Sequence, residues 1–124
     1  MPCSWSIEAD RERALLRMTL SGAFTLADVA QLDLERKAAI GALKGRFNHH
    51  RALIDVRGCD LSSPDVAQAL QVAIGNPVFR ARRCAMVVGS TLVKIQARRV
   101  VQRTDMLFCE RLDEAERWLL DEAA

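Results

Sequence analysis

The chain has 124 residues, of which 50% are hydrophobic and 27% are charged, a composition that predicts one folded domain over residues 1–124. Lysine and arginine number 18 against 16 for aspartate and glutamate, so the net charge gives no argument for binding nucleic acid or a membrane surface. No run reaches the roughly 18 apolar residues of a membrane span, and the first residues lack a basic, apolar leader. We therefore expect a cytoplasmic protein without stable membrane insertion.

The first 22 residues predict two strands, over 4–8 and 14–21, with a charged turn between them. In the second strand Leu16, Met18 and Leu20 alternate with polar residues, which is the period-two pattern of a half-exposed strand. Together the two strands predict an antiparallel hairpin.

A helix and then the central strand of the sheet are expected next. Thr25 is the expected N-cap, Asp28 lies in the first turn, and apolar residues at helical spacing continue to near Gly45. The run 52–56 is almost unbroken in its hydrophobicity, which predicts a strand covered on both faces.

The residues after the central strand predict another helix. Ser63 stands in the N-cap position and Pro64 in the first helical position, and Gly75 is expected to end the helix. A second buried strand follows over 84–88.

The last third of the chain continues the alternation with a helix over 91–103 and a short strand over 106–109. Asp113, followed by Glu116 three residues later, predicts the N-cap of a final helix. The apolar residues of that helix that should face inward are Ala115, Trp118 and Leu119.

The predicted order is therefore ββαβαβαβα. Each helix that crosses between two strands returns the chain to the same end of the sheet, so the alternation implies parallel strands. The sequence predicts an α/β fold with a single mixed, mostly parallel sheet, an N-terminal antiparallel hairpin and about four helices.

Polar residues gather where the predicted parallel strands end, and this edge is where α/β sheets usually place their sites. Asp55 lies in an apolar strand, so its carboxylate needs a hydrogen-bonding partner such as Arg57. The remaining candidates for a binding edge are Asp60, Ser62, Ser63, Ser90 and Thr91.

A second candidate surface is basic. Lys94, Arg98 and Arg103 fall on one predicted helix. Such a run is most often a solvated helix face, and the functional alternative is a patch for an acidic protein surface or a phosphate-bearing headgroup.

Catalytic and metal sites are not expected. His49 and His50 lie in a loop before the central strand, far from Asp55, and we expect both to be exposed to solvent. The cysteines are scattered without a C-x-x-C pair, so they are expected to be thiols without a metal or cofactor: Cys3, Cys59, Cys84 and Cys109. No set of nucleophile, base and orienting group can be assembled, so the sequence does not predict an enzyme.

Several short motifs resemble a known family. The run 53–58, LIDVRG, followed by a serine-rich helix start, resembles the STAS domain of anti-sigma-factor antagonists. The hairpin end Leu20-Ser21-Gly22, the strand motif AMVV over 85–88, and the closing Phe108 with Glu114-Ala115 and Trp118-Leu119 resemble its STAS/SEC14-like, or SpoIIAA-like, branch. The resemblance covers nearly the whole chain.

The resemblance implies a function. In antagonists of this type, a partner anti-sigma kinase phosphorylates a serine at the start of the helix after the central strand, which by position is Ser62 or Ser63. The D-S-S-G motif of the family is replaced here by the run 60–64, DLSSP, and an N-cap role alone is the structural alternative for Ser63.

Two classes of function follow from this resemblance. The first is a non-enzymatic regulatory module, a monomer or weak homodimer, that binds a protein partner such as a regulatory kinase under the control of serine phosphorylation. The second is a small-ligand or lipid-binding SEC14-like domain. A lipid carrier needs a sizeable apolar cavity, whereas a protein-binding module should be well packed with an exposed patch.

Overall fold

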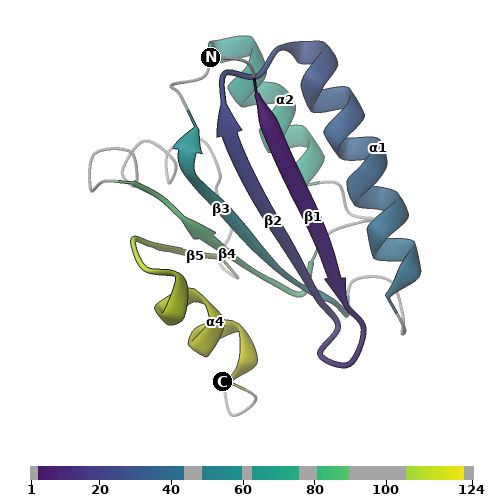
Figure 1. Cartoon of the computed structure of the whole chain (residues 1–124), viewed down its shortest axis with the longest axis vertical. Coiled ribbons are helices and arrows are strands. Elements are labelled where there is room, and N and C mark those ends of the chain that lie inside the picture. The colour runs from purple at the N-terminus through teal and green to yellow at the C-terminus, as the bar shows by residue number, and fades with distance from the viewer. Residues whose placement is uncertain (1–2, 44–48, 60–62, 76–80, 90–105, 122–124) are drawn as a thin grey trace.

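The structure is a computed structural model of the whole chain, and it describes residues 3–43, 49–59, 63–75, 81–89 and 106–121. These segments form a five-stranded sheet with three helices (Figure 1). The strands are β1 Ser4–Asp10, β2 Leu15–Gly22, β3 Arg51–Cys59, β4 Arg83–Val87 and β5 Met106–Cys109, and the helices are α1 Leu26–Ala42, α2 Pro64–Gly75 and α4 Leu112–Leu120.

The strands lie in the order β1-β2-β3-β4-β5. β1 and β2 are antiparallel, and every other neighbouring pair is parallel. The predicted fold class is therefore confirmed. The described segments hold three helices rather than about four, and the helix expected over 91–103 lies outside them.

Each face of the sheet has its own hydrophobic core. On one face α1 and α2 lie side by side, and Leu32 of α1 packs in one cluster with Ile54 and Met86 of the sheet (Figure 1). On the other face α4 places Leu119 in a separate cluster with Leu53. Leu53 and Ile54 belong to different clusters because neighbouring side chains in a strand point to opposite faces.

Local sequence explains where α1 begins. The Thr25 side chain accepts a hydrogen bond from the Asp28 amide at 3.2 Å, and Asp28 Oδ2 accepts one from the Thr25 amide at 2.9 Å. This reciprocal capping box satisfies two backbone N–H groups that the helix itself leaves free. The expected N-cap is confirmed.

The start of the final helix differs from the prediction. Arg111 is the N-cap of α4, and Asp113 lies in the first turn, where its carboxylate accepts hydrogen bonds from the Glu114 amide at 3.0 Å and from Arg111. A carboxylate is stabilised by free amides anywhere in a first turn, so its charge alone does not mark the N-cap. Glu116 binds Arg17 of the sheet instead of closing a capping box.

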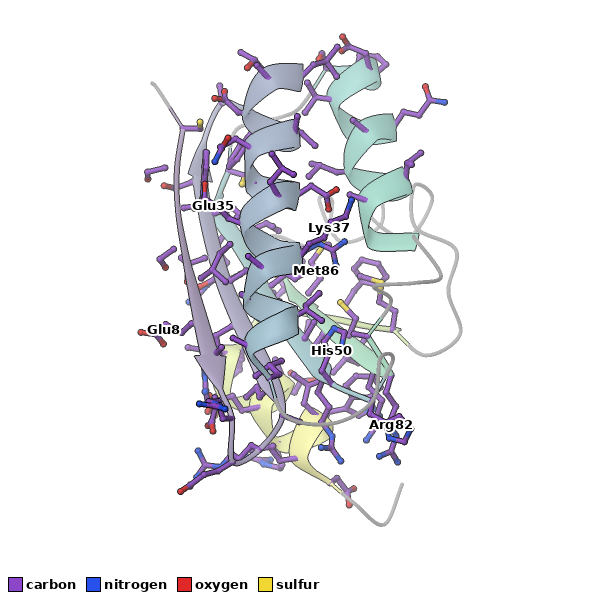
Figure 2. The ribbon with its side chains drawn as sticks, turned by 90° about the vertical axis from the view of Figure 1, so that its right-hand side faces the viewer. Glu8, Glu35, Lys37, His50, Arg82 and Met86 are labelled. Carbon is purple, nitrogen blue, oxygen red and sulfur yellow. The ribbon has the colours of Figure 1, made fainter. Side chains whose placement is uncertain are left out.

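The prediction for the histidines is half wrong. His49 is exposed, but His50 is buried, with 4% of its surface accessible. The strand pairing explains this difference, because the His50 carbonyl accepts a hydrogen bond from the Arg82 amide at 2.8 Å and so ties the residue to the start of β4. In the view of Figure 2, His50 lies between Met86 and Arg82.

The described segments contain neither a disulfide nor a helix that could span a membrane. No disulfide joins the cysteines, and all four of these residues lie within those segments. No helix in the described part of the chain has the length and hydrophobicity to cross a membrane.

Candidate functional site

The carboxyl ends of the parallel strands β3 and β4 lie side by side, on the side of the sheet that we call its carboxyl edge. Thr19, in the middle of β2, pairs with Asp55, but Ser21 pairs with Gly58, so the register of β2 and β3 shifts between them. A Cβ at Gly58 would lie 3.0 Å from that of Ser21, closer than side chains ordinarily approach, so glycine allows this shift. A Cβ at Gly89, just after β4, would lie 3.5 Å from the Arg57 carbonyl oxygen.

Asp55 and Arg57 form a bidentate ion pair at this edge. Arg57 Nε lies 3.0 Å from Asp55 Oδ1, Arg57 Nη2 lies 2.8 Å from Oδ2, and the Arg57 amide donates a third hydrogen bond to Oδ1 at 3.1 Å. Asp55 has only 9% of its surface accessible, whereas the Arg57 side chain is 44% exposed. The expected partner of Asp55 is therefore present.

The pair changes the titration of both groups. Hydrogen bonds from the Arg57 guanidinium lower the pKa of Asp55. Burial of the carboxylate raises this pKa, whereas the backbone amide and the positive charge of Arg57 lower it further. Asp55 in turn raises the pKa of Arg57 through the same hydrogen bonds and charge. The lowered pKa keeps the Asp55 carboxylate ionised, and both of its oxygens accept hydrogen bonds from Arg57. The pair therefore fixes the conformation of the carboxyl edge and is a poor general acid or base.

Ser63 lies exposed directly before α2. Its carbonyl accepts a hydrogen bond from the Ala67 amide at 2.9 Å, as that of an N-cap residue does. Its hydroxyl, however, donates to the Asp65 carboxylate, which also accepts from the Val66 amide at 2.9 Å. The Ser63 hydroxyl and the Val66 amide lower the pKa of Asp65.

The other predicted site residues cannot be placed beside these. Asp60, Ser62, Ser90 and Thr91 of the predicted edge, and Lys94, Arg98 and Arg103 of the predicted basic patch, lie outside the described segments. Within those segments, no group of three or more His, Cys, Asp or Glu side chains could hold a metal ion.

An apolar groove between α1 and α2 was not predicted. It has a volume of about 580 Å³, is open to solvent, and begins at Leu26 and Asp65, near the first turns of the two helices. Leu26 and Val72 on its walls are 51% and 68% exposed. The remaining lining residues are Val29, Ala30, Asp33, Lys37, Gln68, Ala69 and Ala73.

The sequence contained a signal for this groove. Among the apolar residues expected at helical spacing in α1, Val29 and Leu32 are buried, whereas Leu26, which lines the groove, and Leu34, which does not, are exposed. Apolar residues that extend around a helix beyond one stripe indicate either full burial or an exposed contact surface, and here they are exposed.

The sheet order, the antiparallel first strand and the placement of the helices define an α/β domain with a SpoIIAA-like fold, as the sequence motifs predict. A solved structure with this fold is that of an uncharacterized protein of the DUF3478 family from Shewanella loihica, with a TM-score of 0.67 and 22% sequence identity. The similarity covers 94% of this chain and 93% of that one. No family model and no curated protein matches the sequence. At this identity the similarity establishes the fold alone.

Proposed function

We propose that the protein is a non-enzymatic regulatory module that binds a protein partner, such as a regulatory kinase, and that phosphorylation of Ser63 controls the binding. The observation that carries the proposal is the position of an exposed serine hydroxyl at the start of α2, next to Asp65 at the head of an apolar groove. Ser62, outside the described segments, remains the neighbouring candidate for the modification.

Phosphorylation of Ser63 would change the local charge without removing a buried contact. The hydroxyl now donates to Asp65, and a phosphate ester would replace this donor with acceptor oxygens and about −1.5 to −2 charges beside the carboxylate. The free amides in the first turn of α2 favour a negative charge, so the helix should tolerate the modification. Repulsion from Asp65 would alter the head of the groove.

The groove supports binding of a protein rather than carriage of a lipid. It is an open surface feature with exposed Leu26 and Val72, whereas a carried lipid needs an enclosed apolar cavity. Its length along two helices suits an apolar segment of a partner, because an amphipathic helix can lay its apolar face between two others. Binding and phosphorylation would then meet at Asp65.

The test compares capture of partners by tagged variants from native lysate. Val72→Glu places a charge on the groove wall, and Leu112→Glu, at a 42% exposed leucine of α4, is the matched control on the other side of the sheet. Both should fold, because exposed substitutions usually change the free energy of unfolding by within about 0.5 kcal/mol. We expect V72E to lose a protein that wild type and L112E both retain.

The second arm tests the modification. Ser63→Asp should bind the same partner more weakly than Ser63→Ala, and mass spectrometry of the native protein should find phosphoserine in the peptide that contains Ser62 and Ser63. Equal binding of both variants with no phosphoserine would disprove the control by phosphorylation. Equal capture by V72E and wild type would disprove the groove as the binding surface.

A further inference from the structure

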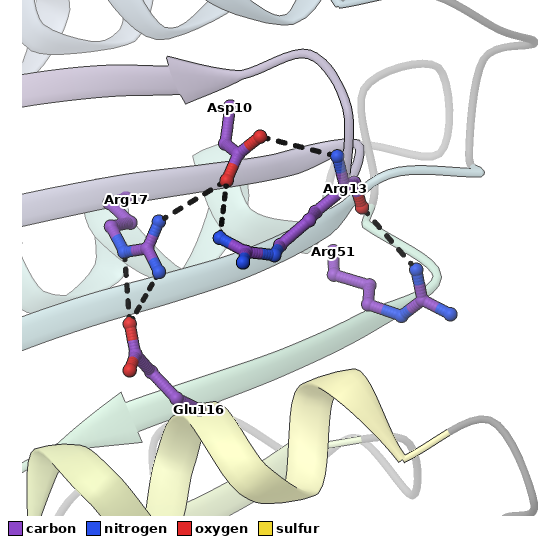
Figure 3. Close-up of polar contacts among 5 residues, drawn as sticks. All are labelled: Asp10, Arg13, Arg17, Arg51 and Glu116. Carbon is purple, nitrogen blue, oxygen red and sulfur yellow. Dashed lines mark hydrogen bonds and ion pairs between the residues drawn. The ribbon is translucent and has the colours of Figure 1, made fainter.

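Arg51 is a buried arginine without a carboxylate partner in the described part of the chain. It begins β3, at the opposite edge of the sheet from Ser63, and has only 9% of its surface accessible. Its Nε atom is buried without a hydrogen bond, and its one side-chain hydrogen bond there runs from Nη1 to the Arg13 carbonyl oxygen at a long 3.5 Å (Figure 3).

The neighbouring arginines differ from Arg51 because they have carboxylate partners. Arg13 and Arg17 share Asp10, at 3.2 and 3.7 Å, and Arg17 also binds Glu116 of α4 (Figure 3). The acidic groups that Figure 3 draws at this edge are thus already engaged by other cations.

A second arginine next to Arg51 also lacks a carboxylate partner among the described residues. Arg83 is the register partner of Arg51 on the adjacent strand. Its Nη1 donates to the Asp121 carbonyl oxygen at 3.1 Å, and its guanidinium carbon lies 3.9 Å from the centre of the Trp118 ring. A carbonyl and a ring face satisfy a guanidinium only in part, because neither carries a full negative charge.

Both side chains belong to the α4 side of the sheet. Arg51 and Arg83 stand two residues before Leu53 and Ala85, which pack in the cluster that contains Leu119 of α4, and residues two apart in a strand point to the same face. Two like charges at paired positions of adjacent strands repel one another, and burial of an unpaired charge is costly. An anion at this position would relieve both effects.

We propose that the amino edge of β3 and β4, on the α4 side, binds a phosphate monoester group between Arg51 and Arg83. The guanidinium fork matches phosphate oxygens, and a group of about −1.5 to −2 charges balances two arginines better than a single carboxylate does. The site lies at the edge opposite to Ser63 and is independent of the proposed control by phosphorylation. A soluble phosphate monoester and the headgroup of phosphatidic acid share this chemistry.

The experiment measures binding of inorganic phosphate by isothermal titration calorimetry, in a buffer whose ionic strength is held constant with chloride. Arg51→Met removes the charge and keeps an apolar side chain, and Arg111→Met, at an exposed arginine of the opposite end of α4, is the control for equal net charge. We expect saturable binding by wild type and R111M, and at least tenfold weaker binding by R51M. Arg51→Lys, which keeps the charge and loses the fork, should also bind more weakly and serves if R51M does not fold.

The source of the phosphate is decided by two further measurements. Binding of glycerol 3-phosphate with the same loss in R51M would support a soluble monoester, and flotation only with vesicles that contain phosphatidic acid, again lost in R51M, would support a lipid headgroup. An absence of saturable phosphate binding by wild type, or equal binding by wild type, R51M and R51K, would overturn the proposal.

Discussion

The two edges of the sheet handle charge in opposite ways. At the carboxyl edge, Asp55 is held by two guanidinium hydrogen bonds and a backbone amide, and Asp65 is held by Ser63 and an amide. At the amino edge, Arg51 is as buried as Asp55 but has no carboxylate in the described part of the chain. Asp55 thus has a partner that offsets the cost of its burial, whereas Arg51 has no such partner among the described residues, which is why we propose that it binds an anion.

The two edges also have separate proposed roles. The exposed serine and the start of the open groove lie at the carboxyl edge, where an added phosphate would change a contact surface. The amino edge instead has cationic side chains whose attraction for an anion does not depend on any modification. The chain would thus carry a protein-binding surface that starts at the carboxyl edge and an anion site at the amino edge of one sheet.

The largest expected effect is at the carboxyl edge. Arg57→Met should lower the free energy of unfolding by about 2 kcal/mol, because hydrogen bonds to charged groups contribute about 1.5–3 kcal/mol and their loss leaves a buried carboxylate with one amide. Arg111→Met is the matched control. Arg111 makes the same two-oxygen contact with Asp113, but the two side chains are 74% and 56% exposed, so its loss should cost within about 0.5 kcal/mol. Urea unfolding at pH 7 measures both, and equal losses would contradict the assigned importance of burial.

A smaller effect should appear as a dependence on pH. The pKa of Asp55 is lower in the folded protein than its ordinary value, so the folded state holds this proton less tightly than the unfolded state. The stabilisation from this carboxylate is therefore fully present above the ordinary pKa, about 4, and is lost as the pH falls through the lowered value. The difference in unfolding free energy between wild type and Arg57→Met should shrink as the pH is lowered from 5 to below about 3. A difference that stays constant over this range would show that the ion pair does not lower the pKa of Asp55.

The sequence predicted the fold better than the site. The period-two hairpin, the apolar run around Ile54 and the reciprocal pair of Thr25 and Asp28 are local patterns, and local patterns determine element type and hence sheet order. The groove, and the lack of a carboxylate partner for Arg51 among the described residues, depend on which side chains meet across distant segments. Nothing near Arg51 in the sequence indicates that Asp10 is engaged by Arg13 and Arg17.

Two predictions were wrong, one because of a contact with a distant residue and one because of a near neighbour. His50 is buried because Arg82, 32 positions later in the sequence, continues the strand pairing by one residue. Asp113 is not a cap because its neighbour Arg111 takes that position and also binds its carboxylate. In both cases the residue type was compatible with either outcome, and a contact that the local pattern does not contain decided between them.

The smallest expected effect is at the amino edge, and its sign is the sharpest test of the comparison. Arg51→Met applies the substitution used at Arg57 to a more deeply buried residue, so simple loss of buried contacts predicts a comparable or larger cost. We expect the reverse: in phosphate-free buffer, removal of a buried charge that has no carboxylate partner among the described residues relieves repulsion from Arg83, while the methionine keeps the packing of the aliphatic stem. The free energy of unfolding should therefore change by less than about 0.5 kcal/mol or increase. A loss near 2 kcal/mol in the same urea measurement would mean that Arg51 has a strong partner within the protein, and the two edges would then not differ in the way described.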